Sequence, residues 1–142
     1  MKSGPRALAP AWHARRMFSA DARALLDRPI TGVITTIDPA GYPQSTAVWF
    51  LFEDDVVKVS MTTSRKKYRN MVANPKATFF VLNPDNEWSF VEIRANVTLE
   101  QDPQRITMLR VGEKHATDVS GFDPAGAVRM TAILRPVNVN AR

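Results

Sequence analysis

The sequence predicts a mainly β protein, a six-stranded antiparallel β-barrel that carries two or three short helices. Short runs rich in β-branched and aromatic residues alternate with turn-forming Gly, Pro, Asn and Asp, a pattern typical of strands and hairpins. No internal repeat or low-complexity segment interrupts this series. Closing the sheet into a barrel leaves no unpaired strand edge, so a small barrel is the favoured arrangement.

The chain of 142 residues is long enough for one domain and too short for two substantial cores. Residues 1–18 contain Gly and Pro and show no clear periodicity, so we predict a flexible N-terminal arm. Ser19 has the character of an N-cap, and a short helix is predicted from there to Pro29. Residues 19–142 are then the predicted barrel domain.

Six segments have the composition of strands, and two more have that of helices. The predicted strands are Ile30–Ile37, Gln44–Phe52, Val56–Met61, Ala77–Leu82, Trp88–Leu99 and Val128–Val139. The turn-rich segment Asp38–Pro43 and the tight connection Glu53–Asp55 join the first three strands into an antiparallel meander. A helix is predicted at Arg65–Asn74, where Pro75 stops it, and another at Pro103–His115.

Composition excludes several classes of protein. The chain has no cysteine, so disulfides, thiolate metal sites and cysteine nucleophiles are ruled out. No apolar run approaches the roughly 20 residues that span a bilayer, and the N-terminus lacks the apolar core of a secretory signal. We therefore expect no membrane partner and a cytoplasmic location. His13 and His115 have no partners at metal-ligand spacing, so no metal site is predicted.

The net charge of +5 is unevenly distributed, with cations gathered at Arg6–Arg28 and Arg65–Arg69. A basic excess is compatible with nucleic acid, a membrane surface or a small anion. Nucleic-acid binding usually needs a broad basic face or a docking motif, and the sequence shows no such motif. A compact cluster at one turn suits a phosphate group better than a duplex, so we expect no nucleic-acid partner.

The second of these clusters belongs to the segment Ser60–Met71, which reads SMTTSRKKYRNM. A strand here ends in hydroxyl residues, and the helix that follows begins with three consecutive cations. Hydroxyls and free first-turn amides donate to phosphate oxygens, and an Arg guanidinium can hold two oxygens at once. Cations are unfavourable at a helix N-terminus, which indicates a compensating anion. A solvated basic helix start remains the alternative.

The sequence shows no nucleophile–base arrangement, dinucleotide glycine fingerprint or P-loop, and it leaves the catalytic residues unknown. A phosphate-binding turn without an acid–base set favours a protein whose cofactor carries the chemistry. Trp49 and Trp88 are large enough to stack on a planar ring, although such residues more often belong to a core or an interface.

Four motifs follow one another in the chain. A turn ending in PQ at Asp38–Gln44 leads into a strand that ends at Val48–Trp49. The pattern S-x-x-x-x-R-x-K-x-R-N-[LM] is then matched by Ser60, Arg65, Lys67, Arg69, Asn70 and Met71. An N-P-[RK]-A segment and a W-S-[FY]-V-x-[IV] strand complete the series, at Asn74–Ala77 and Trp88–Ile93.

Over residues 20–139 this series resembles the pyridoxamine 5′-phosphate oxidase-like split β-barrel superfamily, whose members bind flavins or deazaflavins. Within it, the sequence is most similar to the branch that binds the deazaflavin coenzyme F-420. The resemblance implies a homodimer with cofactor sites at the interface, and a small-molecule substrate. The ending LRPVNVNAR departs from the aromatic and glycine ending typical of the branch.

Carried over by position, the resemblance implies a set of cofactor-binding residues. Ser60, Thr62, Arg65 and Lys67 would hold the phosphate, and Trp88 would approach from the partner subunit. Pro43 to Thr46 and Val48 would border the ring. Lys66 departs from the small or polar residue usual at its position. The complete set is Pro43, Gln44, Ser45, Thr46, Val48, Ser60, Met61, Thr62, Arg65, Lys66, Lys67 and Trp88.

The function that follows from the resemblance is an F-420-dependent oxidoreductase that transfers hydride between the cofactor and an unsaturated small molecule. Coenzyme F-420 has a phosphodiester and an acidic oligoglutamate tail, which suit the run of cations at Arg65–Arg69. One alternative is an FMN-dependent oxidase or reductase on the same barrel. Another is a protein that binds a flavin, a deazaflavin or haem without turnover.

Overall fold

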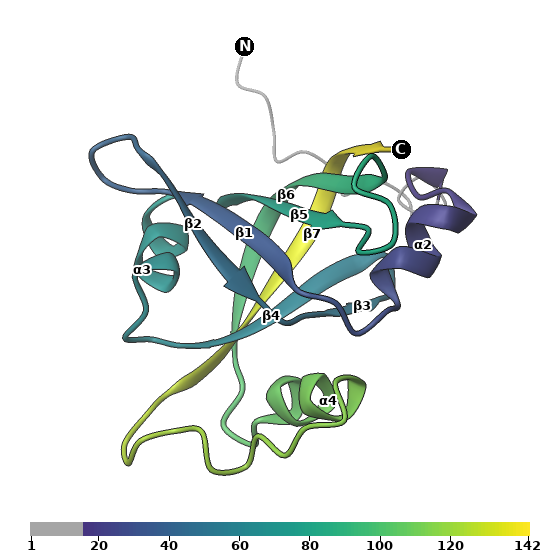
Figure 1. Cartoon of the computed structure of the whole chain (residues 1–142). Helices are drawn as coiled ribbons and strands as arrows, with labels where there is room; N and C mark the ends of the chain where they lie inside the picture. Colours follow the sequence, from purple (N-terminus) through teal and green to yellow (C-terminus); the bar gives the residue numbers. More distant parts are fainter. Residues whose placement is uncertain (1–15) are drawn as a thin grey trace.

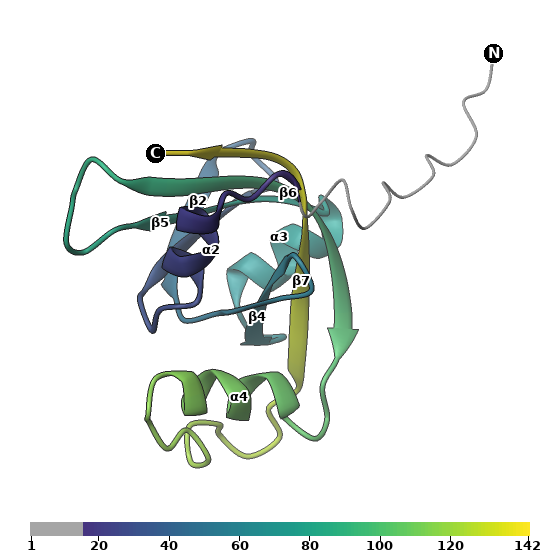
Figure 2. The same ribbon diagram turned by 90° about the vertical axis from the view of Figure 1, so that its right-hand side faces the viewer.

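One seven-stranded antiparallel sheet dominates the computed structural model, which describes residues 16–142 (Figures 1 and 2). The strands are β1 Gly32–Ile37, β2 Pro43–Val48, β3 Leu51–Glu53, β4 Val56–Thr62, β5 Lys76–Leu82, β6 Phe90–Gln101 and β7 Arg129–Ala141. The helices within this range are α2 Ala20–Leu26, α3 Lys66–Ala73 and α4 Ile106–Lys114. The predicted fold class, mainly β with short helices, is confirmed.

The strand order shows why the sheet curls into a split barrel. It runs β2-β1-β5-β6-β7-β4-β3, so β2 and β3 lie at opposite edges of the sheet. Only Trp49 and Phe50 separate these two strands along the chain, and two residues bridge at most about 11 Å between the flanking Cα atoms. The sheet therefore bends until its edges approach each other, while β2 pairs with β1 and β3 pairs with β4.

This arrangement corrects the predicted strand count from six to seven. The sequence predicts one strand over Gln44–Phe52, but the structure divides it into β2 and β3. Because the two halves pair with strands at opposite edges, the chain leaves the hydrogen-bonding ladder at Trp49 and Phe50 to pass between them. Composition alone gives no sign of this break, since the residues around it, from Ala47 to Phe52, are all apolar and mostly β-prone.

Large apolar side chains fill the interior of the curled sheet. Phe50 and Phe79 are fully buried and meet edge to face, with ring centroids 4.7 Å apart. Burial of a side chain of this size contributes about 1.5–3 kcal/mol. Gly32 allows the packing, because a Cβ atom there would lie 2.3 Å from the Phe79 ring. Position 32 of β1 thus needs a glycine, because the Phe79 ring packs directly against its Cα.

Helix α2 packs against the core through Ala22, Leu25 and Leu26. Ser19 caps it as predicted, accepting a hydrogen bond from the Ala22 amide at 3.1 Å. Residues 1–15 of the predicted arm lie outside the described residues. Phe18, which ends the predicted arm, is only 5% exposed and packs against Phe52, with centroids 4.9 Å apart.

Helix α4 lies beyond the end of the sheet that is farther from the C-terminus (Figures 1 and 2). It begins at Ile106 and not at the predicted Pro103, because the Asp102 carboxylate accepts hydrogen bonds from the amides of Ile106 and Thr107. The N-cap residue, Arg105, makes no side-chain capping bond, so the Asp102 carboxylate takes over that role and fixes the first turn. None of the helices within residues 16–142 is both long and apolar enough to cross a membrane.

Candidate functional site

The turn between β4 and α3 leads into a helix whose own first turn carries cations and no acidic residue. Arg65 is the N-cap residue, its side chain makes no capping hydrogen bond, and no acidic residue stands in the first turn. In the turn itself, the hydroxyls of Thr62 and Ser64 lie 2.9 Å apart. Since the first amides of a helix carry a partial positive charge, this turn accumulates positive potential.

A cavity of about 250 Å³ opens beside this turn, and we call it the cationic pocket. Its lining consists of Ser60, Met61, Thr62, Ser64, Arg65, Lys67, Phe122, Asp123, Pro124 and Arg129. Lys67 is only 8% exposed, and burial together with Arg65 and Arg129 lowers the pKa of its ammonium. Among residues 16–142, no carboxylate forms an ion pair with Lys67 or Arg65. A bound anion would relieve this repulsion.

One carboxylate does lie in the cationic pocket. The Arg129 Nε donates to both oxygens of Asp123, at 3.0 and 2.9 Å, and the Arg129 Nη1 donates to the Ser60 hydroxyl at 3.2 Å. Asp123 also faces the Arg105 Nε at 3.5 Å. The hydrogen bonds from Arg129 lower the pKa of Asp123, so this carboxylate is ionised. With Arg65, Lys67 and Arg129 against one carboxylate, the pocket remains net positive.

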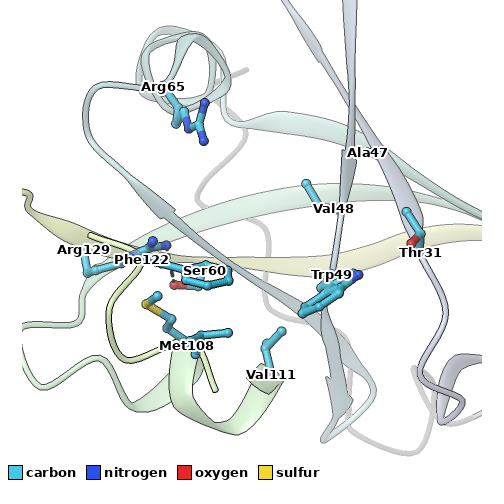
Figure 3. A pocket seen from close by; sticks show the side chains of 11 residues that line it. Thr31, Ala47, Val48, Trp49, Ser60, Arg65, Met108, Val111, Phe122 and Arg129 are labelled. Atoms are coloured by element: carbon cyan, nitrogen blue, oxygen red, sulfur yellow. Dashed lines mark hydrogen bonds between the residues drawn. The ribbon is translucent and has the colours of Figure 1, made fainter. Parts of the chain in front are cut away.

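A second cavity, of about 500 Å³, adjoins the first and is mainly apolar (Figure 3). The two cavities share Ser60, Arg65, Phe122 and Arg129, so they form one cleft with a cationic end and an apolar end. The lining residues specific to the apolar end are Thr31, Ala47, Val48, Trp49, Met108, Val111 and Val119. Figure 3 shows Trp49 across the cleft from Arg129, with Arg65 reaching down from α3.

The indole of Trp49 is held by the end of α4. It stacks on the His115 imidazole at 4.0 Å between centroids and 5° between planes. Burial and the nearby Lys114 lower the pKa of His115, which favours the neutral ring. The Lys114 ammonium donates to the Phe50 carbonyl at 3.2 Å and fixes the residue that follows Trp49. The aromatic wall of the cleft is thus a fixed surface.

The structure brings half of the predicted site residues to the cleft. Ser60, Met61, Thr62, Arg65 and Lys67 line the cationic pocket, and Val48 lines the apolar end. The predicted residues that line neither cavity are Pro43, Gln44, Ser45, Thr46, Lys66 and Trp88.

Most of these other residues have contacts elsewhere. The Gln44 side-chain amide donates to the Thr46 hydroxyl at 3.0 Å, and Ser45 shares a hydrogen bond with Thr35 across the β1–β2 pair. The Lys66 ammonium lies 3.6 Å from Asp38. Trp88 is 77% exposed in the β5–β6 connection, which Figure 1 shows near α2 and away from α3.

Sequence reasoning missed Arg129, Asp123 and Phe122 as residues of the cleft. Arg129 reaches it because β7 pairs with β4 in a register that sets Arg129 opposite Thr62. Nothing local in the sequence specifies the register of two strands so far apart in the chain. The turn-rich composition of the segment between α4 and β7 also gives no sign that Phe122 lines the cleft.

Comparisons with known proteins agree with this picture. The family model described as pyridoxamine 5′-phosphate oxidase matches residues 18–134. No curated protein matches the chain. A solved structure of an F-420 reductase has 32% sequence identity and a TM-score of 0.77, with 83% of this chain and 94% of that chain covered.

Two further structures are similar in fold alone. A conserved hypothetical protein of Mycobacterium tuberculosis has 18% identity and a TM-score of 0.72, covering 88% of this chain and 84% of that one. An FMN-binding, pyridoxamine 5′-phosphate oxidase-related protein of Nostoc punctiforme has 17% identity and a TM-score of 0.60, covering 94% and 84%. The resemblance that the motifs indicate is confirmed, and the chain belongs to the pyridoxamine 5′-phosphate oxidase family.

Proposed function

We propose that the protein is an oxidoreductase that binds coenzyme F-420 in the cleft and transfers hydride between this cofactor and an unsaturated small molecule. The observation that carries the proposal is the shape and charge of the cleft, with a cationic pocket continuous with an apolar, tryptophan-lined cavity. A phosphate-bearing planar cofactor has the same division between an anionic end and a ring.

The cationic pocket fits the anionic end of such a cofactor. The Ser60 and Thr62 hydroxyls, the Arg65 guanidinium and the Lys67 ammonium are all available as donors to phosphate oxygens. Lys67 is the strongest argument, because its buried ammonium has no carboxylate partner within residues 16–142, which is costly unless an anion joins it. A contact to Lys67, which is buried, gains strength from the lower local dielectric.

The apolar end fits the ring. Val48 and Trp49 form one wall, and Met108 and Val111 of α4 form the other. When bound, a deazaflavin supplies a hydride from its C5 carbon. The protein's own contribution is to orient the ring and to exclude water around it. Among residues 16–142, no Asp, Glu or His side chain lines the apolar end, so we infer that the substrate proton comes from solvent or from a group near the ring.

Two observations favour coenzyme F-420 over FMN. The solved structure with 32% identity is an F-420 reductase. In addition, Arg69 lies exposed on α3, where its guanidinium donates to the Ser64 carbonyl of the turn, and an acidic oligoglutamate tail would meet its positive charge there. FMN ends in a single phosphate and needs fewer cations.

We also propose that the protein is a homodimer whose second copy covers the outer face of the sheet. On this face Val33 of β1 lies opposite Ala47 of β2 on one side and opposite Phe80 of β5 on the other. The Phe80 ring stacks on Phe90, with 5.6 Å between centroids. Ala47 also lines the apolar cavity, so the proposed interface borders the cleft. The exposed Trp88 is then available to reach the cleft of the other copy, as the family resemblance implies.

The test is a titration of the purified protein with coenzyme F-420 and with FMN, followed by fluorescence, together with its molar mass in solution. We expect F-420 binding with quenching, weaker FMN binding, and the mass of a dimer. Tight FMN binding with none for F-420 would assign the cleft to FMN. Binding without turnover of enones, quinones and tetrapyrroles would instead indicate a cofactor-binding or haem-binding protein that is not an enzyme.

A further inference from the structure

Asp123 stands out because a carboxylate lines a pocket that otherwise collects cations. It occupies one edge of the Arg129 guanidinium, with the Nε donating to both carboxylate oxygens and the Nη2 donating to Oδ1. The remaining nitrogen, Nη1, turns to the Ser60 hydroxyl at 3.2 Å. Ser60 lines both cavities, so this nitrogen lies at the boundary between the cationic and apolar ends.

The same carboxylate anchors the segment that carries Phe122. Asp123 faces the Arg105 Nε at 3.5 Å, and the Arg105 Nη2 donates to the Ser120 carbonyl at 2.9 Å. Phe122 lies between these two anchors and lines both cavities. Its side chain is exposed to the extent of 63%, so packing alone holds it weakly. The ion pairs at Asp123 therefore fix where this ring stands.

We propose that Asp123 is a positioning residue for the cofactor site, which aims the Arg129 Nη1 at the anionic end of the cofactor and holds Phe122 beside its ring. This inference rests on the proposed function, because it assigns further residues to the same cleft. Arg129 then joins Ser60 as a ligand of the anion, while Asp123 acts through Arg129 without touching the cofactor.

Two opposing effects decide whether such a carboxylate helps. Its negative charge repels an incoming phosphate, which lowers affinity. Its bidentate bonds restrict a flexible arginine to the geometry that serves the anion, so less side-chain entropy is lost when the cofactor binds. The structure favours the second effect, because Asp123 is shielded by Arg105 and Arg129 on two sides and its side chain is only 10% exposed.

The experiment compares Asp123→Asn with Asp118→Asn in the full-length protein. Asp118 is a matched control, since it lies in the same segment and its carboxylate accepts hydrogen bonds only from Ser120 among the described residues. The probes are coenzyme F-420 and its deazaflavin core without the phosphodiester tail, with FMN and riboflavin as the corresponding pair. Affinity is measured by fluorescence, and thermal unfolding is recorded for each variant.

We expect Asp123→Asn to weaken binding of the phosphate-bearing cofactor about tenfold, and to change binding of the tailless ring by about threefold or less. Asp118→Asn should leave both affinities unchanged. In an Arg129→Met background, Asp123→Asn should have no further effect on the phosphate-bearing cofactor, because the two residues act as one unit. A purely structural role would lower both affinities together and would add to the Arg129 substitution.

The other possible results contradict either the proposed function or the positioning role of Asp123. If the wild-type protein binds none of the four probes, the proposed function fails and the inference fails with it. If the wild type binds but Asp123→Asn behaves like Asp118→Asn, or binds phosphate-bearing cofactor more tightly, only the positioning role is wrong. Retained binding of the tailless ring shows that a variant is folded, which keeps the comparison decisive.

Discussion

Two clusters of charged side chains in this protein each contain two cations, but they differ in whether a carboxylate is hydrogen-bonded to those cations. In the first, the Glu53 carboxylate accepts hydrogen bonds from the Lys58 ammonium at 2.8 Å and from both terminal nitrogens of Arg110. These bonds lower the pKa of Glu53 from 4.5 to about 2. In the second, Arg65 and Lys67 share the cationic pocket without a carboxylate of their own among residues 16–142.

The difference separates a structural role from a binding role. The Glu53 cluster joins α4 to β3 and β4, and both of its cations are hydrogen-bonded to its own carboxylate, so these groups are engaged with one another. The Lys67 ammonium has the opposite properties, since its pKa is lowered by burial and by two neighbouring cations. Proteins retain such a cost mainly at functional sites. Substitutions in the two clusters should therefore act on different quantities.

The largest expected effect is on cofactor affinity at Lys67. We expect Lys67→Ala to weaken cofactor binding by about 1–3 kcal/mol, the scale of a lost charge-assisted hydrogen bond. Fluorescence titration measures this loss. Lys76→Ala is the control, because Lys76 is an exposed lysine on β5 outside both cavities. An affinity equal to that of the control would show that the cationic pocket is only a solvated surface.

In the Glu53 cluster, by contrast, a substitution should change the stability of the protein and not its affinity for the cofactor. We expect Glu53→Gln to lower the free energy of unfolding by about 1–2 kcal/mol at pH 7, a partly solvent-screened ion-pair network, with cofactor affinity unchanged. Because the pKa of Glu53 is lower in the folded protein, this contribution is fully present above pH 4.5. It is lost as the pH falls through about 2.

Denaturant unfolding of wild type and Glu53→Gln across pH 2–7 checks this prediction. The two curves should converge at the acidic end of the range. A constant difference at every pH would mean that the glutamine variant is destabilised through packing and not through lost charge.

A smaller effect is expected at the aromatic wall. Trp49→Ala should weaken binding of the cofactor ring by about 0.5–1.5 kcal/mol, the usual range of an aromatic contact. The loss should be the same for the phosphate-bearing cofactor and for its tailless ring, in contrast to the loss at Lys67. Titration with both ligands measures it. A loss confined to the phosphate-bearing form would place Trp49 at the wrong end of the cleft.

The smallest expected effect is that of salt, which should change cofactor affinity at the cationic pocket more than the stability contributed by the Glu53 cluster. Raising ionic strength from about 0.05 to about 0.5 M shortens the Debye length to a few ångströms and should weaken cofactor binding several-fold. The free energy of unfolding should change less, because the Glu53 bonds are direct contacts. Equal sensitivity of affinity and stability to salt would contradict the distinction between the clusters.

The sequence is sufficient for the fold class and for one end of the cleft. Strand and turn signals are local, and so is the succession of hydroxyls and cations from Ser60 to Lys67, which the structure gathers into one pocket. Residues further along the chain could not be predicted, since Arg129 reaches the pocket only through the register of β4 against β7. A sequence pattern predicts a strand, but it does not predict which strand pairs with it.

The helix that lines the cleft illustrates the same limit. Its existence was predictable, but its start at Ile106 depends on the Asp102 carboxylate, which accepts from the first two amides of the helix. Met108, 5% exposed, turns inward, whereas Ile106 and Leu109, 54% and 44% exposed, do not. Which apolar residues of such a short helix turn inward depends on where its first turn begins.

The two-residue link between β2 and β3 limits how this chain can vary in length. Trp49 faces the cleft while Phe50 is fully buried in the core, because neighbouring residues of an extended chain point to opposite sides. A single inserted residue would exchange the two, sending an indole into the core and a benzyl group into the cleft. A change of length at this link would therefore disturb the core and the cleft together.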